Sequence, residues 1–460
     1  MAGEAADWLR RPQVPPSSKE NPFERFGFSR NPFPSKPSVV IGSEGDTLPY
    51  LPTLRAQEEQ RFEELMIPRP DRSTSRAIAF LMDYATRRGR GIGKTVFLNH
   101  QRKRIMSDLG RSLAGDSYVL FAVHILPLPG GSRKFWQVAR LIAEGMSEQG
   151  AIARALWRLR AFSTIIPNEI LSQTADNPED TIGNDAWLRK QGVDVDFQLA
   201  SYIRTELIQG GVRPEVAKAL AYFGHDPFAW RGSFLAHQTD SSWRNEGTKL
   251  VFDDLVRLFI LAGFSKGLLL VDEVEKIVTE QNMQERRTFV DLIRYYFIDG
   301  SCENTRHDFY SLFLTIHPYV QELLVPHWEA AGLDRFAALS REFAQEYTVY
   351  FHPLNQESAE PLVRVYLDAA RPSESPQREL LTPFDRRAVE EALVRSGGVP
   401  GKMLELLHHA MERAVDKQWS SIGAEQIHQV FQDRPPEQPE DEEISTTQLP
   451  PAHPDLRGNG

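Results

Sequence analysis

Two patterns of hydrophobic residues alternate along this chain: short continuous runs, and runs in which apolar residues recur every three or four positions. Continuous runs bounded by turn residues are typical of buried parallel strands, and the wider spacing is typical of amphipathic helices. The predicted strands cover residues 77–82, 118–126, 267–271, 311–316 and 347–351. The predicted helices cover residues 54–65, 96–104, 135–146, 151–162, 195–209, 214–222, 250–264, 285–297, 320–324, 334–342, 359–370, 384–395, 400–415 and 424–432. Strands separated by helices predict an α/β fold with a parallel sheet.

The first predicted strand leads into a glycine-rich loop. Residues 91–95 read Gly-Ile-Gly-Lys-Thr, the end of a phosphate-binding loop in which glycine backbones let successive N–H groups face an anion. Lys94 is expected to reach the β- and γ-phosphates of a nucleotide, and Thr95 to hold Mg²⁺. Because Arg88 stands where the usual motif has its first glycine, a Gly/Arg surface turn is the alternative. The predicted nucleotide-binding residues are Gly89, Gly91, Ile92, Gly93, Lys94, Thr95 and Val96.

Two acidic residues follow the third predicted strand. Residues 267–276 read Gly-Leu-Leu-Leu-Val-Asp-Glu-Val-Glu-Lys, so Asp272 and Glu273 are expected at the C-terminal edge of the sheet, where open α/β sheets bind ligands. Asp272 is predicted to orient Mg²⁺ through water, and Glu273 to polarise the attacking water. An acidic helix start after an apolar strand is also ordinary capping chemistry. Together with the glycine-rich loop, the two acids favour a nucleotide site.

Composition limits the further possibilities. The chain has 460 residues, 41% hydrophobic and 25% charged, which predicts a globular protein of two or three structural units. Its net charge of −10 gives no global attraction to nucleic acid or to a membrane, so any DNA contact must come from a local patch. Cys302 is the single cysteine, which excludes an internal disulfide and indicates a reducing, cytoplasmic setting. The most apolar run, residues 255–264, contains Arg257 and is too short to cross a bilayer.

The order of these features resembles that of the AAA+ ATPases. A phosphate loop is followed by a strand, an acidic strand, a strand ending in Thr-Ile-His, a strand after an arginine, and a helical lid. The order is similar to the initiator and transposition-regulator branch, and residues 268–275 are also similar to ATPases of BREX-type phage defence. The resemblance covers residues 75–430 less an insertion. It implies a P-loop fold that binds ATP and Mg²⁺ and hydrolyses ATP.

The resemblance also implies roles for residues outside the two motifs. Thr315 matches the polar sensor at the end of its strand, with His317 as the alternative. Arg341 or Arg335 would be the arginine finger, which faces the γ-phosphate of a neighbouring subunit and completes the site only in a homo-oligomer. Lys402 stands where the lid usually carries an arginine, and lysine lacks the planar fork of that side chain.

Five parts are expected along the chain. They are an N-terminal extension and strap (1–74), an AAA+-like nucleotide-binding core (75–147 and 246–355), a helical insertion (148–245), a helical lid (356–432) and a disordered acidic, proline-rich tail (433–460). The phenylalanine-rich residues 21–34 are expected to brace the structure or to form a strap over the nucleotide-binding core. His408 and His409 are adjacent on a predicted helix and should diverge by about 100°, which argues against joint metal ligation.

The insertion is the expected site of partner recognition. Arg154, Arg158 and Arg160 lie close together on a predicted helix, and aromatic residues cluster around Phe223, Phe228 and Trp230. These arginines are predicted either to form a solvated face or to contact nucleic acid or a protein. The leading hypothesis is an oligomeric ATPase that acts on DNA or on a DNA-bound partner, in phage defence or mobile-element biology. The alternative is a signalling NTPase switch in which nucleotide gates assembly, and a nucleotide-binding scaffold without catalysis is a weaker third.

Overall fold

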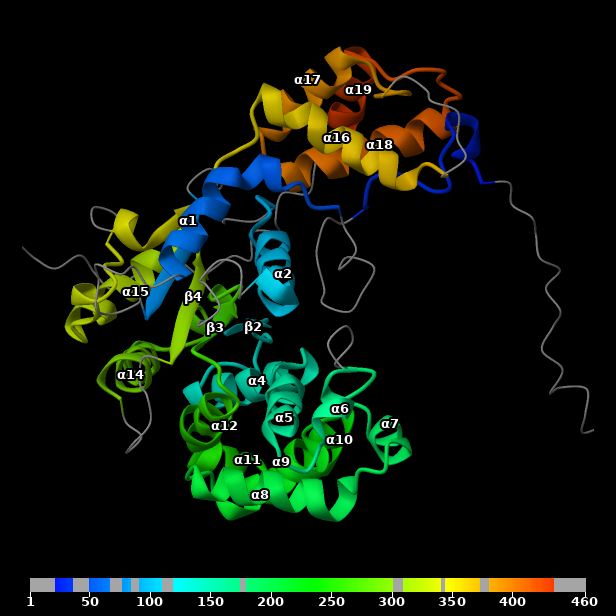
Figure 1. The fold of residues 1–460 in the computed structure, drawn as a ribbon. Coiled ribbons are helices and arrows are strands. Elements are labelled where there is room, and N and C mark those ends of the chain that lie inside the picture. The colour runs from blue at the N-terminus through cyan, green and yellow to red at the C-terminus, as the bar shows by residue number, and fades with distance from the viewer. Residues whose placement is uncertain are drawn as a thin grey trace, which may run out of the picture. The chain divides into compact units, whose positions relative to one another are not determined.

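The computed structural model describes residues 21–35, 49–66, 77–83, 91–109, 119–173, 179–300, 309–340, 344–372 and 380–433. The chain divides into two compact units, one from Met1–Pro37 together with Leu354–Gly460, and one from Ser38–Pro353. Within the described residues, no helix combines the length and the hydropathy needed to span a membrane. Figure 1 shows the labelled helices and strands of both units.

A five-stranded parallel sheet organises the larger unit. Its strands are β1 (Ile78–Met82), β2 (Leu120–Ile125), β3 (Lys266–Val271), β4 (Tyr310–Ile316) and β5 (Thr348–Tyr350). They lie in the order β2-β3-β4-β1-β5 and pair in parallel throughout. Every residue of β1 to β4 is buried, which explains why these strands appear in the sequence as continuous apolar runs. The predicted α/β class and the five predicted strands are confirmed.

Helices cover both faces of the sheet. On one face, α1 (Ala56–Met66) and α2 (Lys94–Arg104) pack their apolar residues against alternate strand positions such as Leu81 and Leu270. The other strand positions, such as Phe80 and Leu269, pack in a second hydrophobic cluster on the opposite face. Helices that contribute to this second cluster are α4 (Phe135–Glu148), α14 (Met283–Arg294) and α15 (Pro318–Ala330). Successive residues of each strand point to opposite faces of the sheet, so each strand contributes to both hydrophobic clusters.

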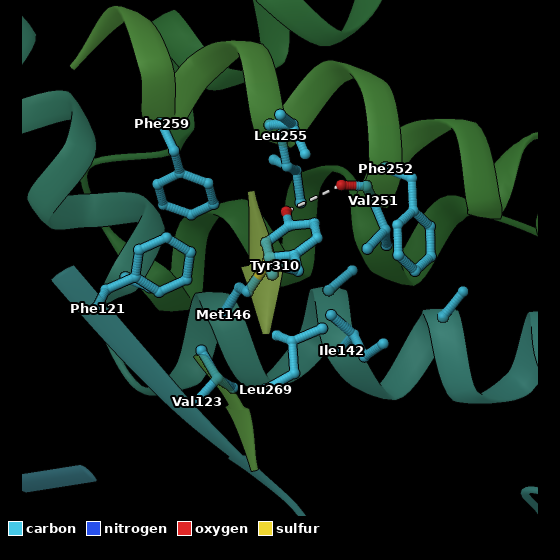
Figure 2. Packing of buried hydrophobic residues seen from close by; sticks show 14 of the residues in the cluster. Phe121, Val123, Ile142, Met146, Val251, Phe252, Leu255, Phe259, Leu269 and Tyr310 are labelled. Carbon is cyan, nitrogen blue, oxygen red and sulfur yellow. Dashed lines mark hydrogen bonds between the residues drawn. The ribbon is translucent and has the colours of Figure 1, made fainter. Parts of the chain in front are cut away.

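A long helical insertion connects β2 to β3. Residues 148–245 contain α5 (Ala151–Phe162), α6 (Asn168–Leu171), α7 (Asp185–Lys190), α8 (Ala200–Gln209), α9 (Pro214–Phe223), α10 (Pro227–Ser233) and α11 (Asp240–Ser242), with the π-helical segment η5 (Val195–Leu199). The π-helical segments η7 (Trp243–Gly247) and η8 (Leu250–Asp254) and helix α12 (Leu255–Leu261) then lead from the insertion into β3. The buried residues of the insertion belong to the same hydrophobic cluster as the sheet. Figure 2 shows this junction: Phe121 of β2 stacks on Phe259 at 4.1 Å, and the Tyr310 hydroxyl donates to the Val251 carbonyl at 3.0 Å. The insertion is thus continuous with the core.

One predicted helix, residues 334–342, is wrong. Only a single 3₁₀ turn, η10 (Leu333–Arg335), forms there, and residues 336–340 are irregular. The Gln321 side chain donates to the Leu339 carbonyl at 2.6 Å, and Trp328 Nε1 donates to the Ala337 carbonyl at 2.7 Å. Side chains of α15 therefore bind the backbone of a segment whose apolar spacing imitates a helix.

In its described residues, the smaller unit consists of four α-helices and an N-terminal segment. The helices are α16 (Gln356–Ala370), α17 (Arg386–Ser396), α18 (Pro400–Asp416) and α19 (Ala424–Asp433), close to their predicted bounds. The phenylalanine-rich segment 21–35 packs on these helices: the Phe33 ring lies 5.6 Å from that of Phe384, and Ser29 Oγ donates to the Ala370 carbonyl at 3.1 Å. The segment therefore braces the C-terminal helices, which agrees with the first of its two expected roles, and a strap over the nucleotide-binding core stays a prediction.

Candidate functional site

The glycine-rich loop enters α2 with the backbone geometry of an anion-binding turn. Gly91 has φ of 84° and Gly93 has φ of 99°, values that a residue with a Cβ rarely adopts. Gly93 caps α2, so Lys94, Thr95 and Val96 form the first turn of the helix, where backbone N–H groups lack helical acceptors. These groups and the helix dipole suit a phosphate. Gly89 lies outside the described residues.

A buried arginine that the sequence analysis missed supports this loop. Arg55 Nη2 donates to the carbonyl of Ile92 at 2.7 Å. Its Nη1 also donates to the Glu58 carboxylate at 3.0 Å and to the His352 carbonyl at 2.8 Å. Arg55 and Ile92 are both buried, so the guanidinium fixes the loop backbone between the start of α1 and the end of β5.

Asp272 lies directly after β3 and is the centre of the hydrogen bonds in the site. Its Oδ2 accepts from Thr95 Oγ1 at 2.5 Å, and its Oδ1 accepts from Thr315 Oγ1 at 2.7 Å. Burial alone would raise the pKa of Asp272, but the nearby His124 ring and the two hydroxyl donors hold it well below its usual range. The carboxylate is therefore ionised at neutral pH and available to a cation.

Glu273 follows in a backbone conformation that is unusual for a residue with a side chain. Its φ is 47°, and its N–H donates to Asp272 Oδ1 at 2.9 Å and to Thr315 Oγ1 at 2.8 Å. Such left-handed residues cost on the order of 1 kcal/mol and are concentrated at functional sites. The Glu273 carboxylate is partly exposed and forms an ion pair with Lys276. The side chain can thus reach solvent while its backbone is fixed by Asp272 and Thr315.

Two further buried groups escaped the sequence analysis. Asp83 lies directly after β1, is fully buried and forms an ion pair with Lys94. His124, the residue before the end of β2, places its Nε2 3.5 Å from Asp272 Oδ2, while neither ring nitrogen has a hydrogen-bond partner. At that distance the contact with Asp272 is mainly electrostatic. Asp83 and His124 could have been predicted from the sequence, because each is a polar residue at the carboxyl end of an apolar strand.

The parallel sheet explains why these residues meet. Met82 pairs with Ile316, and Ile125 pairs with Val271, so the carboxyl ends of β1 to β4 are aligned at one edge. The polar residues at this edge come from four separate stretches of the chain: Asp83, His124, Asp272, Glu273 and Thr315. The phosphate loop begins α2 beside them, since Thr95 reaches Asp272. This arrangement follows the general rule for ligand sites in open α/β sheets.

The donor set fits a magnesium nucleotide. A threonine hydroxyl and an ionised carboxylate, Thr95 and Asp272, are the hard oxygen ligands that Mg²⁺ takes, with its other positions filled by water and phosphate. Lys94 adds a compact positive charge at the start of the helix. His124, with both ring nitrogens unpartnered beside Asp272, is a buried polar group that a bound ligand or water could satisfy.

The remaining predicted residues have no contact with Thr95, Asp272 or Thr315 among the described hydrogen bonds and ion pairs, or lie outside the described residues. Arg341 lies outside the described residues. Arg335 ends η10 and is exposed. Lys402 lies in the first turn of α18, in the C-terminal unit, and is partly buried. Their roles as arginine finger and lid residue remain predictions.

The predicted basic face on α5 is wrong at Arg160, whereas Arg154 and Arg158 are partly exposed. Arg160 is only 2% exposed; it donates to the Ile182 carbonyl at 2.9 Å and forms an ion pair with Asp185 at 2.9 Å. Arg158 donates to the Ala262 carbonyl at 2.6 Å, and its guanidinium lies 5.5 Å from the Phe162 ring. These contacts show that both arginines serve the packing of the insertion. Residues two apart on a helix point in different directions, so Arg158 and Arg160 contact different neighbours. Trp230 is also buried, whereas Phe228 is 85% exposed.

Comparisons with known proteins found similarity to solved structures alone. No family model and no curated protein matches the chain. The chain is similar to the Aeropyrum pernix Orc1 protein solved in complex with DNA, at 12% identity and a TM-score of 0.38 over 84% of this chain and 66% of that chain, slightly under two thirds of its length. It is also similar to Cdc6p from Pyrobaculum aerophilum, at 13% identity and a TM-score of 0.41 over 86% of this chain and 72% of that chain.

Proposed function

We propose that this protein is a Mg²⁺-dependent ATPase of the AAA+ kind that assembles into an oligomer and acts on DNA or on a DNA-bound protein. The observation that carries the ATPase proposal is the contact of Thr95, Asp272 and Thr315 beside a glycine turn at the start of a helix. This arrangement joins phosphate binding, a cation ligand and a polar sensor at one edge. The sequence order supports the further proposals of an oligomer, of a DNA-associated partner, and of a role in phage defence or mobile-element biology.

Each side chain has a role that follows from its position. Bound Mg²⁺ would neutralise charge on the phosphate oxygens, and Thr95 and Asp272 would hold it. Lys94 and the first N–H groups of α2 bind and orient the phosphates. Glu273 polarises a water molecule and accepts its proton at the carboxylate. Thr315 fixes the positions of Asp272 and of the Glu273 backbone through its hydroxyl.

A signalling switch is the second candidate, and two ion pairs favour it. Lys94 is paired with Asp83, and Glu273 is paired with Lys276. Both groups must leave these partners before they can act on a nucleotide and on water. Such a resting state suits a protein that holds nucleotide for long periods and hydrolyses it slowly until a partner binds.

Substitution of Glu273 tests the catalytic assignment. Glu273→Gln removes the proton acceptor but keeps the size and the polarity of the side chain, so turnover should fall about 100-fold or more while ATP binding is retained. Lys94→Ala should lose ATP binding itself. Steady-state ATPase activity and equilibrium binding of a fluorescent ATP analogue measure the two effects. Unchanged hydrolysis in both variants would contradict a nucleotide site at this edge.

Stimulation by DNA separates the two candidate functions. The intact protein would be assayed for ATPase activity with and without double-stranded DNA over a range of salt concentrations, since contacts to phosphates weaken as salt rises. A turnover that rises with DNA supports the DNA-directed ATPase. A tightly held nucleotide with slow turnover that DNA does not change supports the switch.

A further inference from the structure

We propose that His408, His409 and Glu412 on α18 form a binding site for a divalent transition-metal ion of the Zn²⁺ class. Each of the three residues directs a possible ligand atom toward the others, and these atoms all lie within 4.8 Å of one another. His408 Nε2 lies 3.2 Å from Glu412 Oε1, and His409 Nδ1 lies 3.1 Å from Glu412 Oε2. The cluster belongs to the C-terminal unit and is separate from the nucleotide site.

The two histidines meet although they are adjacent on a helix. The sequence predicts that their side chains diverge, and their ring planes are indeed 78° apart. However, His408 presents its far nitrogen, Nε2, whereas His409 presents its near nitrogen, Nδ1. Glu412 is four residues from one histidine and three from the other, and both spacings place it on their side of the helix. The different reach of the two nitrogens would allow this pair to ligate one ion jointly.

A backbone carbonyl fixes the hydrogen on His408. Its Nδ1 lies 2.8 Å from the carbonyl oxygen of Phe33, and a carbonyl can only accept a hydrogen bond. The neutral ring must therefore carry its hydrogen on Nδ1 and direct the lone pair of Nε2 at the Glu412 carboxylate. Nε2 and Oε1 lie 3.2 Å apart, so a cation must lie between their lone pairs, either the second proton of a protonated ring or a metal ion that takes its place. Metal-binding histidines commonly have this arrangement, with the second nitrogen donating to a backbone carbonyl.

The donor types fit zinc better than magnesium. His408 Nε2 lies 3.2 Å from one Glu412 oxygen and His409 Nδ1 lies 3.1 Å from the other, so an ion between the three side chains would take the carboxylate as a bidentate ligand. Two imidazoles and one carboxylate favour Zn²⁺ and similar ions over Mg²⁺, which prefers oxygen ligands. The fourth position would be open to water or to a partner group.

The surroundings hold the ligands in place before a metal binds. Leu407 and Met411 on α18 are fully buried, so the helix cannot rotate freely. Asn31 Nδ2 donates to the His408 carbonyl at 3.2 Å, and segment 21–35 is thus bound to the same turn of α18 that carries the ligands. A bound metal would stabilise the contact between this segment and the helix.

Metal titration of the full-length protein tests the proposal. Chelator-treated protein, free of nucleotide and Mg²⁺, would be titrated with Co²⁺ by visible absorption and with Zn²⁺ by calorimetry. We expect one ion per chain at this site, with the d–d absorption of a four- or five-coordinate cobalt ion. His408→Ala, His409→Ala and Glu412→Gln should each weaken binding about 10-fold or more, the scale of losing one contact in a metal site.

Two control variants place the bound ion. His428→Ala removes a histidine of α19 that pairs with Glu391 at 3.6 Å, so it should leave the affinity unchanged. Asp272→Asn removes the cation ligand of the nucleotide site and should also leave this affinity unchanged. Zn²⁺ should raise the melting temperature of the wild type and of both controls, but not that of Glu412→Gln.

Three results would overturn the proposal. They are the absence of cobalt absorption bands, an affinity weaker than about 1 mM, and equal affinities for Glu412→Gln, His409→Ala and His428→Ala. Far-UV circular dichroism checks that each variant is folded. If His408→Ala does not fold, the other two ligand variants decide, because Glu412→Gln has the shape of the original side chain and His409 is not part of the contact with Phe33.

Discussion

At the level of single residues, the ion pair between Asp83 and Lys94 links the stability of the empty protein to nucleotide binding. Both side chains are buried, Lys94 at 9% exposure and Asp83 at 0%. Removing one member of a buried pair leaves the other charge without compensation. Phosphates would provide that compensation only when nucleotide is bound.

We therefore expect Asp83→Asn to destabilise the nucleotide-free protein by on the order of 3 kcal/mol. In the wild type, Lys94 must break its ion pair with Asp83 to bind phosphate, and in the variant this cost is absent. MgATP should therefore raise the melting temperature of the variant more than that of the wild type. Thermal unfolding with and without MgATP measures both effects.

Asp254→Asn is the matched control for this experiment. It breaks another ion pair of a buried carboxylate, in which Arg213 Nη2, of a partly exposed arginine, lies 2.6 Å from Asp254 Oδ2. This variant should be less stable than the wild type, but MgATP should raise its melting temperature by as much as it raises that of the wild type. Equal gains in Asp83→Asn and the wild type would show that Asp83 does not compete with phosphate for Lys94.

Residues of the site differ in how far the sequence could predict them. Lys94, Thr95, Asp272 and Glu273 stand in two recognisable motifs, and the structure brings the side chains of Thr95 and Asp272 and the backbone N–H of Glu273 into one hydrogen-bonded group with Thr315. Their catalytic roles remain predictions. The partners Asp83 and His124 belong to no motif, and their contacts depend on strand register, which local spacing does not contain.

At the level of elements, one carboxylate connects three parts of the insertion. Asp185, at the start of α7, accepts from Arg160 of α5 at 2.9 Å and lies 3.0 Å from Nε2 of His225, between α9 and α10. Burial would raise the pKa of Asp185, but these partners lower it from 3.8 to about 2. The shift means that the folded state favours the ionised carboxylate.

Asp185→Asn should destabilise the protein by about 2 kcal/mol at neutral pH. The folded pKa lies below the unfolded one, so this contribution is complete above about pH 4 and is lost as the pH falls toward 2. The stability gap between wild type and variant should narrow over that range. Denaturant unfolding at pH 7, 5, 4 and 3 measures it.

Asp196→Asn is the control for the pH series, because Asp196 pairs with Arg189 at 2.9 Å on the surface. Exposed pairs contribute little, so this variant should match the wild type at every pH. A gap for Asp185→Asn that stays constant from pH 7 to pH 3 would contradict the pKa assignment.

Element prediction failed where tertiary contacts replaced local ones. Helix α5 has the predicted bounds because its apolar spacing and its preceding glycine both agree with a helix. Residues 334–342 have similar spacing, but Gln321 and Trp328 bind their backbone carbonyls from outside. The position of segment 21–35 on α16 and α18 could not be predicted. Its aromatic rings indicate that the segment is buried, but they do not indicate which helices bury it.

At the level of the whole molecule, the proposed oligomer would place an arginine of one subunit at the nucleotide of the next. Arg335 is exposed and therefore free of the packing that would prevent such a role. Arg341 stands within the same stretch of sequence, directly before the last strand. An arginine finger contributes about 10³-fold or more to turnover.

Mixed oligomers test this assignment. Arg335→Ala and Arg341→Ala would each be mixed with Lys94→Ala protein, and ATPase activity would be measured against each protein alone. The finger variant should be inactive by itself and should regain part of its activity in the mixture, because the two defects fall on opposite sides of a shared interface. A variant with normal turnover by itself is not the finger, and normal turnover in both would argue against a finger in this stretch.

The order of strands in the sheet has a consequence for synthesis on the ribosome. Among the described strands, β2 pairs only with β3, about 140 residues later, and β1 pairs only with β4 and β5. Two apolar strands therefore emerge early without neighbours, and closing such long loops makes folding slow. Nascent chains shorter than about 316 residues cannot form the edge that unites Asp83, Asp272 and Thr315. We expect these chains to depend on chaperones, and nucleotide to assist folding only after β4 has left the ribosome.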